Sequence, residues 1–578
     1  MDDQSKSTTY RFLLGSFLLV VVAVVLILLS SKNQSLTVDE PHHLYGGLEW
    51  LQEGSNSVWP ENPPFARIFV ALGPYLHGHT LDFNLPDNLQ IYDYFSASYD
   101  LSYFDKGEIA NQLFWLRILI LPFFLLSACM VWFWTRKIGS PVAAFFAMGM
   151  YVTLPPILAH SGLGTTDIAF VAVFMLMLFA FMHWLKKPSW KSSIYFGGTT
   201  GVCLLTKYSV FAFFPPIAIS ALFLFFFFDV RANQRSILSW LRSMIGHSLI
   251  VAIVAFLCVW SFYGFSIGTL GEQQIIRTII EQGEISDKLT NIKVPAPEWV
   301  AGIRLLYYHN GVGHLSYALG EVSPKGFWYY YPMSVLLKTP WPFLIFFILG
   351  FIGIFRGGRS HWNWELILIM LTPFVVLISV MTSNINIGLR HILIIYPMAA
   401  IGAAVGINRL FQQSTFRSFN RYAFSSALLV WQMVIAVVNF PHYISYFNGF
   451  AGEEPGIFLI DSNLDWGQGL LALATFSEEN DIDEINLHYF GVGRSCWYSL
   501  PKINSLTPNI PVKGWVAISE MAYWGPWVGT AKNDEECFIF NFKPTFENDR
   551  LVNSRFKWLE KYPLKAKIGG SIRIYYIE

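Results

Sequence analysis

The chain has 578 residues, of which 54% are hydrophobic and only 13% are charged, roughly half the charged share of an average soluble protein. Thirty-nine basic residues balance 39 acidic ones, so the long-range attraction of a strongly basic nucleic-acid-binding protein is missing. The high apolar content also excludes a disordered chain. A mean hydropathy of +0.43 over this length predicts many membrane-spanning helices and not a single anchor.

Long apolar runs recur from the N-terminus to about residue 440. A helix needs about 20 apolar residues to cross the hydrocarbon core, because every backbone polar group there must be satisfied internally. We interpret the first run as a retained helix, since no convincing small-residue cleavage site follows it. The runs predict 11 spans, near residues 12–31, 115–135, 141–159, 167–185, 192–207, 209–228, 244–265, 330–354, 364–381, 391–408 and 422–440.

Lysine and arginine mark every second short connection between these spans. Because positive residues stay cytoplasmic, the pattern predicts a multi-pass protein of the inner, cytoplasmic membrane with its N-terminus in the cytoplasm. Residues 32–114, residues 266–329 and the tail from residue 441 then lie outside. The marking residues are Arg136, Lys137, Lys186, Lys187, Lys191, Arg231, Arg235, Arg242, Arg356, Arg359, Arg409, Arg417 and Arg421.

The tail differs in character from the rest of the sequence. Short apolar strands such as GIFLID, INLHYF, WVAIS and SIRIYY alternate with the helix-like stretches LLALATFSEEN and FKWLEKY. This pattern predicts a small extracytoplasmic α/β domain over residues 441–578, after a transmembrane domain over residues 1–440. Of the five cysteines, only Cys496 and Cys537 stand where they could pair.

Acidic residues lie at the expected outer ends of two spans. Asp39 and Glu40 follow the first span, Glu61 precedes two prolines in WPENPPFARIF, and Asp167 begins the fourth span after TT. All four reach the same side of the membrane, so they could converge on one polar site. The alternative is that each caps a helix or is simply solvated, and Asp167 after two threonines fits an N-terminal cap. The histidines nearby in sequence are His42, His43 and His160.

Three basic residues lie at or below the outer surface of apolar spans, namely Lys207, Lys338 in YYYPMSVLLKTPW and Arg390 in NINIGLRHILIIYP. An ionisable residue within a span is costly unless it is paired or hydrated, which marks it as a functional candidate. Cations that face carboxylates suit a phosphate, because they hold the anion while an acid takes a proton or binds a metal. The alternatives are side chains that extend to the interface and a set of internal ion pairs.

A second outer segment carries His309, His314 and Glu321, which could bind a metal or contact a substrate. Its aromatic cluster FWYYY fits an interfacial belt or a platform for a sugar. A lone histidine is more often a hydrogen-bonded structural residue than a ligand. The sequence has no P-loop and no GxGxxG after a strand, so we expect no nucleotide cofactor.

Several motifs are familiar. The acidic pair after the first span, the ENPP turn and the TTD at the head of the fourth span resemble the GT-C superfamily of polytopic glycosyltransferases. The closest branch is glycosyltransferase family 39, with the protein O-mannosyltransferases and the lipid A aminoarabinose transferases. GHLSYALGE, FWYYYPMSVLLKTP, INIGLRHILIIYP, HYISYFNGFAG and DSNLDWGQGL resemble a prokaryotic subgroup described as phospholipid-carrier-dependent glycosyltransferases. The resemblance covers nearly the whole chain.

The resemblance implies a mainly helical GT-C fold with about 11 transmembrane helices. Amphipathic external helices from the first long loop would lie over a cavity open to the bilayer. It also implies transfer of a sugar, with inversion, from a polyprenyl-phosphate donor to an extracytoplasmic acceptor that is a protein, a lipid or a glycan. No nucleic acid is an expected partner.

The matching motifs also imply catalytic roles. Asp39 corresponds to the acid taken as general base or acceptor-positioning residue, with Glu40 beside it, and Asp167 to the acid at the head of the fourth helix. We expect acceptor or substrate contacts from His42, His43 and Asp465. For Asp465 in SNLDWGQ a structural turn is the alternative, since an aspartate in such a loop commonly bonds its own backbone.

Metal and phosphate contacts follow from the aminoarabinose transferase branch. Glu61 corresponds to an acid that helps to bind a divalent metal there, and His314 is our assignment for the metal-binding histidine. The sequence departs from that branch at Asn62, where a lysine is expected. The donor phosphate contact is therefore expected from Lys207, Lys338 or Arg390.

Two other function classes compete with a glycosyltransferase. A secondary transporter of a polar or anionic solute would also carry buried charges, but it predicts an inverted repeat that the sequence does not display. A non-catalytic scaffold would need fewer spans and has no use for an intramembrane Lys338. Labelled polyprenyl-phosphate sugar supplied to proteoliposomes distinguishes transport from transfer: a transporter moves the label across the membrane, whereas a glycosyltransferase moves it onto an acceptor.

Overall fold

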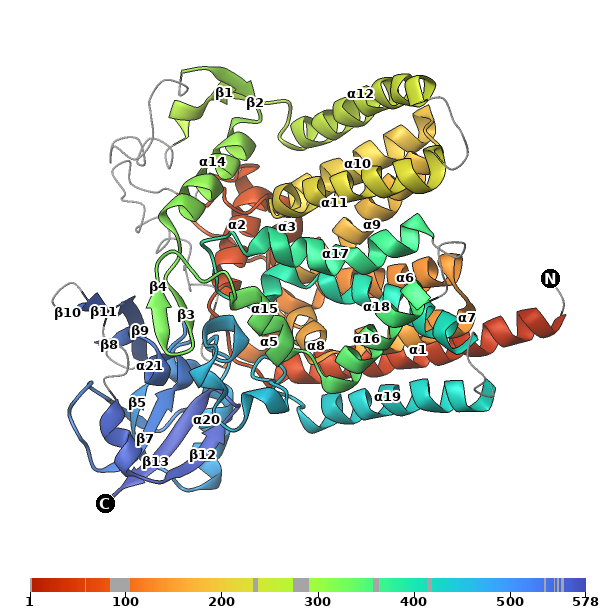
Figure 1. The fold of residues 1–578 in the computed structure, drawn as a ribbon. Coiled ribbons are helices and arrows are strands. Elements are labelled where there is room, and N and C mark those ends of the chain that lie inside the picture. The colour runs from red at the N-terminus through yellow and green to blue at the C-terminus, as the bar shows by residue number, and fades with distance from the viewer. Residues whose placement is uncertain are drawn as a thin grey trace.

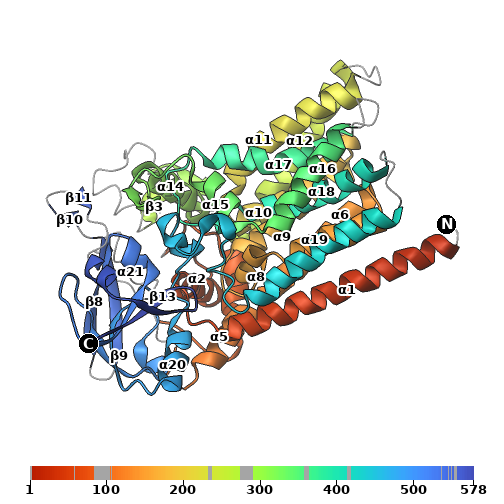
Figure 2. The same cartoon turned by 60° about the horizontal axis from the view of Figure 1, so that its bottom comes forward.

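The computed structural model is mainly helical, with a mixed sheet at one end of a helical bundle (Figure 1). The N-terminus of α1 lies at the opposite end of the bundle from that sheet (Figure 2). The structure describes residues 3–57, 59–83, 104–105, 107–231, 237–273, 291–356, 363–412, 418–534, 537–544, 546–547, 550–551 and 556–578.

The described part of the first half of the chain is mainly helical. A π-helical turn over Phe226–Val230 extends α11. The helices are α1 (Asp3–Lys32), α2 (Glu40–Glu53), α3 (Pro64–Leu76), α5 (Ile109–Ile118), α6 (Leu121–Ile138), α7 (Pro141–Val152), α8 (Pro155–Ser161), α9 (Asp167–Lys186), α10 (Trp190–Thr206), α11 (Val210–Phe225) and α12 (Ile237–Phe262).

The middle of the chain adds two short hairpins and further helices. The hairpins pair β1 (Ile267–Thr269) with β2 (Lys293–Pro295) and β3 (Ser316–Ala318) with β4 (Glu321–Ser323). The helical elements are α14 (Pro297–Val312), α15 (Tyr330–Lys338), α16 (Trp341–Arg356), α17 (Trp364–Val380), the 3₁₀ turn η5 (Leu389–Ile392), α18 (Ile395–Gln412) and α19 (Ser418–Val438).

Each of the expected spans overlaps a helix, but several of these helices are short. Among the described residues, five helices are long and apolar enough to cross a membrane, or up to seven if two bent pairs each form one span. The pairs are α7 with α8, bent by 66°, and α15 with α16, bent by 110°. Proline stands at both bends: Pro155 is the first residue of α8 and Pro340 lies between α15 and α16, and proline cannot continue a preceding helix. The total of 11 spans stays a prediction.

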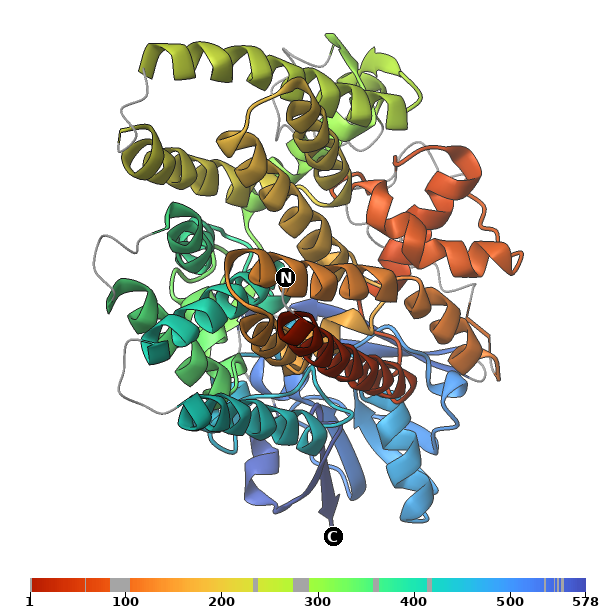
Figure 3. The ribbon, with the colours of Figure 1, turned by 90° about the vertical axis from the view of Figure 1, so that its right-hand side faces the viewer.

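Among the long apolar helices that the structure describes, α9 is the most buried; Figure 3 views the bundle from the side at which the N-terminus of α1 lies. Of the apolar window in α9, 83% is buried, against 11% in α12, so α9 is a core helix and α12 is largely exposed. Small residues allow α16 and α18 to approach: a Cβ atom on Gly406 would lie 2.0 Å from the carbonyl oxygen of Gly350. Such close contact is typical of helices packed in membranes.

Two short helices, α2 and α3, follow α1 in the expected external segment. They pack on each other with the buried side chain of Arg67 between them, where it donates to the carbonyl of His42 and to Oδ1 of Asn56. A Cβ atom at Gly46 would lie 2.0 Å from Cζ of Arg67, so glycine is needed at this position. The arginine therefore fixes the start of α2, where the acidic pair stands.

The tail carries a five-stranded sheet in the order β12-β13-β7-β5-β6. The pairs β12/β13 and β13/β7 are antiparallel, whereas β7/β5 and β5/β6 are parallel. α20 (Leu470–Glu479) and α21 (Glu520–Trp524) accompany the sheet. The strands of this sheet are β5 (Glu484–His488), β6 (Lys502–Ser505), β7 (Gly514–Ser519), β12 (Leu564–Ile568) and β13 (Ile572–Ile577). Two separate hairpins pair β8 (Trp527–Asp534) with β9 (Cys537–Pro544) and β10 (Phe546–Glu547) with β11 (Arg550–Leu551).

Most of the predicted tail elements form, with one exception. INLHYF, WVAIS and SIRIYY lie on β5, β7 and β13, LLALATFSEEN forms α20, and FKWLEKY contains the 3₁₀ helix Lys557–Lys561. The strand expected for GIFLID is wrong. Gly456 and Ile457 belong to the 3₁₀ turn Pro455–Ile457, and Asp461 begins a second turn, Asp461–Asn463, where its positive φ of 59° ends any extended backbone. Cys496 is disulfide-bonded, while the side chain of Cys537 lies outside the described residues.

Candidate active site

Four charged residues meet near the end of the bundle that carries the sheet. Nζ of Lys207 lies 2.6 Å from Oδ1 of Asp167, and Nη1 of Arg390 lies 2.7 Å from Oδ2 of Asp39. The same Arg390 nitrogen is 3.6 Å from Oδ2 of Asp167, which joins the two pairs. We call Asp39, Asp167, Lys207 and Arg390 the ion-pair cluster. It brings together two of the four expected acids, Asp39 and Asp167, and two of the three expected cations.

Helix ends place these side chains. Asp39 is the N-cap residue of α2 and Asp167 the first residue of α9, while Lys207 follows the last residue of α10. Acidic residues at helix N-termini and a basic residue at a C-terminus complement the helix dipoles. The capping alternative for Asp167 is wrong, because Thr166 is the N-cap residue and Asp167 pairs with Lys207.

Exposure divides the four residues into two kinds. The side chain of Asp39 is 26% exposed and that of Lys207 is 13% exposed, so both reach open surface. Asp167 is only 1% exposed and holds both cations from within. The side chain of Arg390 is 6% exposed, so a substrate can contact Asp39, Lys207 and the exposed part of Arg390, whereas Asp167 fixes the cations in place.

Arg390 is held from several sides by the tail. Its guanidinium carbon lies 4.2 Å from the centre of the Trp466 ring, and its Nε donates to Oγ of Ser462 at 3.2 Å. Burial opposes the charge, but Asp39, Asp167 and Asp461 raise the pKa of Arg390 above its ordinary value. Arg390 therefore stays charged although it is buried.

Asp461 is a residue that the sequence did not single out. Burial raises its pKa to about 7, although the charge of Arg390 acts in the opposite direction. Its backbone has a φ of 59°, a strained conformation for a residue other than glycine, and strain of this kind clusters at functional sites. The signal in the sequence was the DSNLDWGQ motif, whose first aspartate faces Arg390.

Histidines also border the cluster. Burial lowers the pKa of His43, so its ring is neutral. In the part of the chain that the structure describes, Nδ1 of His43 and Nε2 of His391 are buried without a hydrogen-bond partner. His43 thus remains a candidate substrate contact. His42 instead packs edge-on against Trp59, with ring centres 5.5 Å apart.

Glu40 does not join the cluster. Both of its carboxylate oxygens pair with Arg117, whose Nε and Nη2 each donate at 2.7 Å. Backbone N–H groups of Thr37 and Gly164 donate to the same carboxylate, which is fully buried. These partners hold the pKa of Glu40 below its usual value against the opposing effect of burial. Glu40 is therefore a structural ion-pair partner, and we do not keep it as a catalytic residue.

Lys338 and Asp465 are likewise occupied elsewhere. Nζ of Lys338 donates to the carbonyl oxygens of Ile444 and Asn463 at 2.7 and 2.5 Å. Asp465 accepts from Oγ of Ser519 and from backbone N–H groups in its own turn and at the start of α21. Both side chains are buried. We therefore keep neither Lys338 as a phosphate ligand nor Asp465 as an acceptor contact.

The expected metal residues form a chain of hydrogen bonds through His309. Oε1 of Glu61 lies 2.7 Å from Nδ1 of His309, whose Nε2 lies 3.3 Å from Nδ1 of His314. Glu61 raises the pKa of His309 despite burial, while burial and His309 lower that of His314 to about 4. Within the described ranges, no three His, Cys, Asp or Glu side chains are placed to hold a metal ion. The divalent metal stays a prediction, and no step below uses it.

Part of the chain matches a known family. The matched residues are 109–262, which include Asp167 and Lys207 of the ion-pair cluster. The family is dolichyl-phosphate-mannose-protein mannosyltransferase. Over these residues the match confirms the resemblance to the protein O-mannosyltransferases and supports a glycosyltransferase as the class of enzyme. No curated protein sequence matches the chain.

Solved structures of three glycosyltransferases are similar in part. ArnT from Cupriavidus metallidurans bound to undecaprenyl phosphate is 15% identical, with 74% of this chain and 70% of that chain covered and a TM-score of 0.45. The Archaeoglobus fulgidus oligosaccharyltransferase tethered with an acceptor peptide is 12% identical, covering 93% and 75%, with a TM-score of 0.41. The arabinofuranosyltransferase AftD from Mycobacteria is 11% identical, covering 92% and 40%, with a TM-score of 0.36. At these identities and TM-scores, the structural similarity is no evidence for the activity of this chain.

Proposed function

We propose that this chain is a membrane glycosyltransferase that transfers a sugar, with inversion, from a polyprenyl-phosphate donor to an extracytoplasmic acceptor. The observation that carries the proposal is the ion-pair cluster, in which the partly exposed carboxylate of Asp39 lies beside Lys207 and Arg390. The family match over residues 109–262 supports the same class, since the family's description names a lipid-phosphate sugar as donor.

The donor phosphate would bind at Lys207 and Arg390. Lys207 is partly exposed, and Arg390 presents a planar fork of donors that fits phosphate oxygens. The cluster pairs two carboxylates with two cations, so a bound phosphate competes with Asp39 for the guanidinium. As Arg390 turns its hydrogen bonds toward the phosphate, the carboxylate of Asp39 is left open to accept a hydrogen bond from the acceptor hydroxyl.

Transfer then follows as one displacement. Asp39 takes the proton from the acceptor hydroxyl, and the acceptor oxygen forms a bond to the anomeric carbon of the sugar. The bond from that carbon to the phosphate oxygen breaks, and its electron pair leaves with the polyprenyl phosphate. Lys207 and Arg390 stabilise the negative charge that develops on the leaving group, which is usually the largest electrostatic contribution to such a step.

The test is a transfer assay with purified protein in proteoliposomes. Labelled polyprenyl-phosphate sugars are supplied one at a time, with an extract of envelope acceptors outside, and label is followed in both the product and the lumen. We expect Asp39→Asn to lower transfer by about 10²- to 10⁴-fold, the usual contribution of a positioned base.

Glu53→Gln is the matched control, because Glu53 is an exposed acid at the end of the same helix, α2. It should leave the rate of transfer unchanged. Label that accumulates in the lumen without a product would indicate a transporter. Equal turnover by wild type and Asp39→Asn would remove Asp39 from the proposed step.

A further inference from the structure

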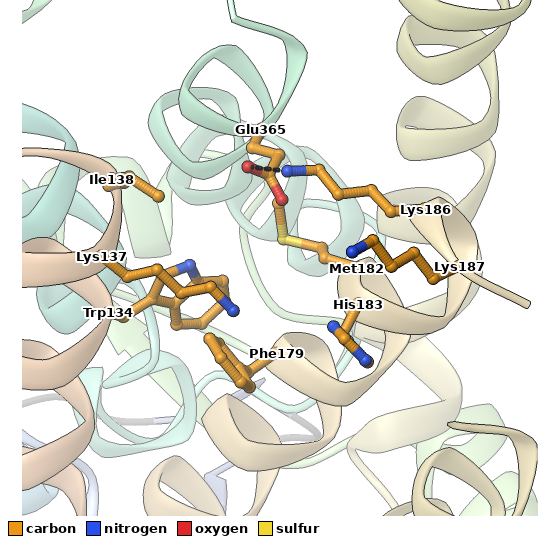
Figure 4. Close-up of a pocket in the computed structure, with 9 residues that line it drawn as sticks. All are labelled: Trp134, Lys137, Ile138, Phe179, Met182, His183, Lys186, Lys187 and Glu365. Atoms are coloured by element: carbon orange, nitrogen blue, oxygen red, sulfur yellow. Dashed lines mark ion pairs between the residues drawn. The ribbon is translucent and has the colours of Figure 1, made fainter. Parts of the chain in front are cut away.

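A second polar site lies at the other end of the bundle. There α6 and α9 end beside the start of α17, and their side chains enclose a cavity of about 220 Å³ (Figure 4). No residue of the ion-pair cluster lines this cavity. Its lining residues are Trp134, Lys137, Ile138, Phe179, Met182, His183, Lys186, Lys187 and Glu365.

The rim of the cavity is basic. Lys137, Lys186, Lys187 and His183 stand around it, and Glu365 is the single carboxylate among the lining residues that the structure describes. Glu365 is already occupied, since its Oε2 lies 2.5 Å from Nζ of Lys186. Figure 4 shows Lys186 turned to Glu365, while Lys137 and Lys187 lie apart from that pair. At least two cations therefore remain for an anion.

The floor of the cavity is apolar. Trp134 and Met182 are buried beneath the rim, and Phe179 lies beside them. Nζ of Lys137 stands 4.5 Å from the centre of the Phe179 ring, which holds the ammonium over the cavity by a cation–π contact. An apolar floor below a cationic rim suits a molecule that joins an anionic group to an apolar body.

The position of the cavity fits the headgroup level of one leaflet. α9 runs from Asp167 in the ion-pair cluster to Lys186 at the cavity, and its 20 residues span about 30 Å. That length equals the hydrocarbon thickness of a typical bilayer. The cavity thus lies one membrane thickness from the candidate active site, at the end of the bundle that the lysine and arginine pattern predicts to be cytoplasmic.

Membrane topology alone explains positive charge in the connection after α9, but it does not explain why a cavity is present there. Lys191 supplies such charge outside the cavity, where its Nζ lies 5.3 Å from the Trp190 ring. We propose that the cavity at Lys137 and Lys187 binds a phosphate anion. The occupant is either the headgroup of an anionic phospholipid in that leaflet or a free phosphate from the adjoining water. This proposal is independent of the proposed function.

The test measures binding to the purified full-length protein in a neutral detergent by native mass spectrometry. The probes are phosphatidylglycerol, phosphatidylcholine and inorganic phosphate. We expect phosphatidylglycerol to bind more tightly than phosphatidylcholine, and Lys137→Gln and Lys187→Gln each to weaken it about fivefold. If a large excess of inorganic phosphate displaces the lipid, free phosphate is a ligand in its own right. If it does not, the lipid headgroup is the occupant.

Two further variants make the result specific. Glu365→Gln removes the partner of Lys186 without removing positive charge, so it should tighten phosphatidylglycerol binding, the opposite of the lysine variants. Lys191→Gln, the matched control, should leave binding unchanged. Equal binding of phosphatidylcholine, unchanged binding in Lys137→Gln and Lys187→Gln, or equal weakening by Lys191→Gln would overturn the proposal.

Discussion

Asp39 and Asp167 contact the same arginine, yet only one of them reaches the surface. Asp39 is partly exposed and pairs with Arg390 alone among the residues that the structure describes, whereas Asp167 is enclosed with Lys207 and Arg390. Removing a charge from an enclosed group leaves its partners buried and uncompensated, which costs far more than the same change at a partly solvated group. Neutralising Asp167 should therefore lower the free energy of unfolding more than neutralising Asp39, although both substitutions should reduce transfer.

We expect Asp167→Asn to lower the free energy of unfolding by about 3 to 5 kcal/mol, because Lys207 and Arg390 lose a buried partner. Asp39→Asn should lower it by about 1 kcal/mol or less. Thermal unfolding of both variants in the same detergent measures the difference. Similar losses for the two would contradict the division of roles.

Asp461 gives a prediction that depends on pH. Its folded pKa of about 7 lies above the unfolded value near 4, so the folded state favours the protonated acid. Wild type therefore loses stability as the pH rises from about 4 to about 7, and the loss is complete above that range.

Asp461→Asn removes this loss, and asparagine tolerates the positive φ at that position. The variant should be more stable than wild type by roughly 1 to 3 kcal/mol above neutral pH, with the gap closing toward pH 4. Unfolding midpoints across the range measure the effect. A gap that stays constant with pH would show that Asp461 does not carry the proton.

At the scale of elements, the pair of Glu40 and Arg117 joins α2 to α5. Arg117 also donates to the carbonyl oxygens of Ser31, Gln34 and Ser35, so it fixes the loop between α1 and α2. Asp39 and Glu40 are consecutive, and side chains one residue apart at a helix start point in different directions. That is why the acidic pair divides, with one member facing the cluster and the other facing the core.

Glu40→Gln should destabilise the protein by about 3 to 5 kcal/mol, because the guanidinium of Arg117 is left buried without a counter-charge. The double variant Glu40→Met with Arg117→Met should recover part of that loss. Recovery is incomplete because three carbonyl oxygens then lack their donor. Unfolding measured for both variants tests this, and a single variant as stable as wild type would refute the structural role of Glu40.

At the scale of the whole molecule, the tail folds back into the membrane domain. Backbone N–H groups of Ser35 and Val38 donate to the carbonyls of Gln468 and Trp466, and Oδ1 of Asn463 accepts from the N–H of Leu389. The tail therefore sets the position of Arg390 and closes the candidate active site. The buried Lys338 secures the same segment through two carbonyl oxygens.

Lys338→Met should loosen the tail without weakening the binding of a polyprenyl phosphate. Two buried carbonyl oxygens lose their donor, at a cost of about 1 to 3 kcal/mol each, so amide hydrogen exchange over residues 441–470 should quicken. Lys325→Met, at an exposed lysine, is the control. A loss of phosphate binding with unchanged exchange would instead restore Lys338 as a ligand.

Sequence patterns predicted the apolar helices and half of the site, but not the bends between α7 and α8 and between α15 and α16. Apolar runs predict the helices because length and composition alone decide them, and charges at their outer ends predict the meeting of Asp39, Asp167, Lys207 and Arg390. The pairing of Glu40 with Arg117 and the partners of Lys338 were not predictable, since Arg117 lies 77 positions from Glu40 and Ile444 lies 106 positions from Lys338. Asp461 was missed because GIFLID has the composition of a strand, and only tertiary contact with η5 shows its role.

The most direct test is a structure of the protein saturated with a polyprenyl phosphate. The account predicts phosphate oxygens within about 3 Å of Nζ of Lys207 and of the guanidinium of Arg390, with Asp39 open to the acceptor side. A phosphate bound at Lys338, or away from every residue of the ion-pair cluster, would contradict it.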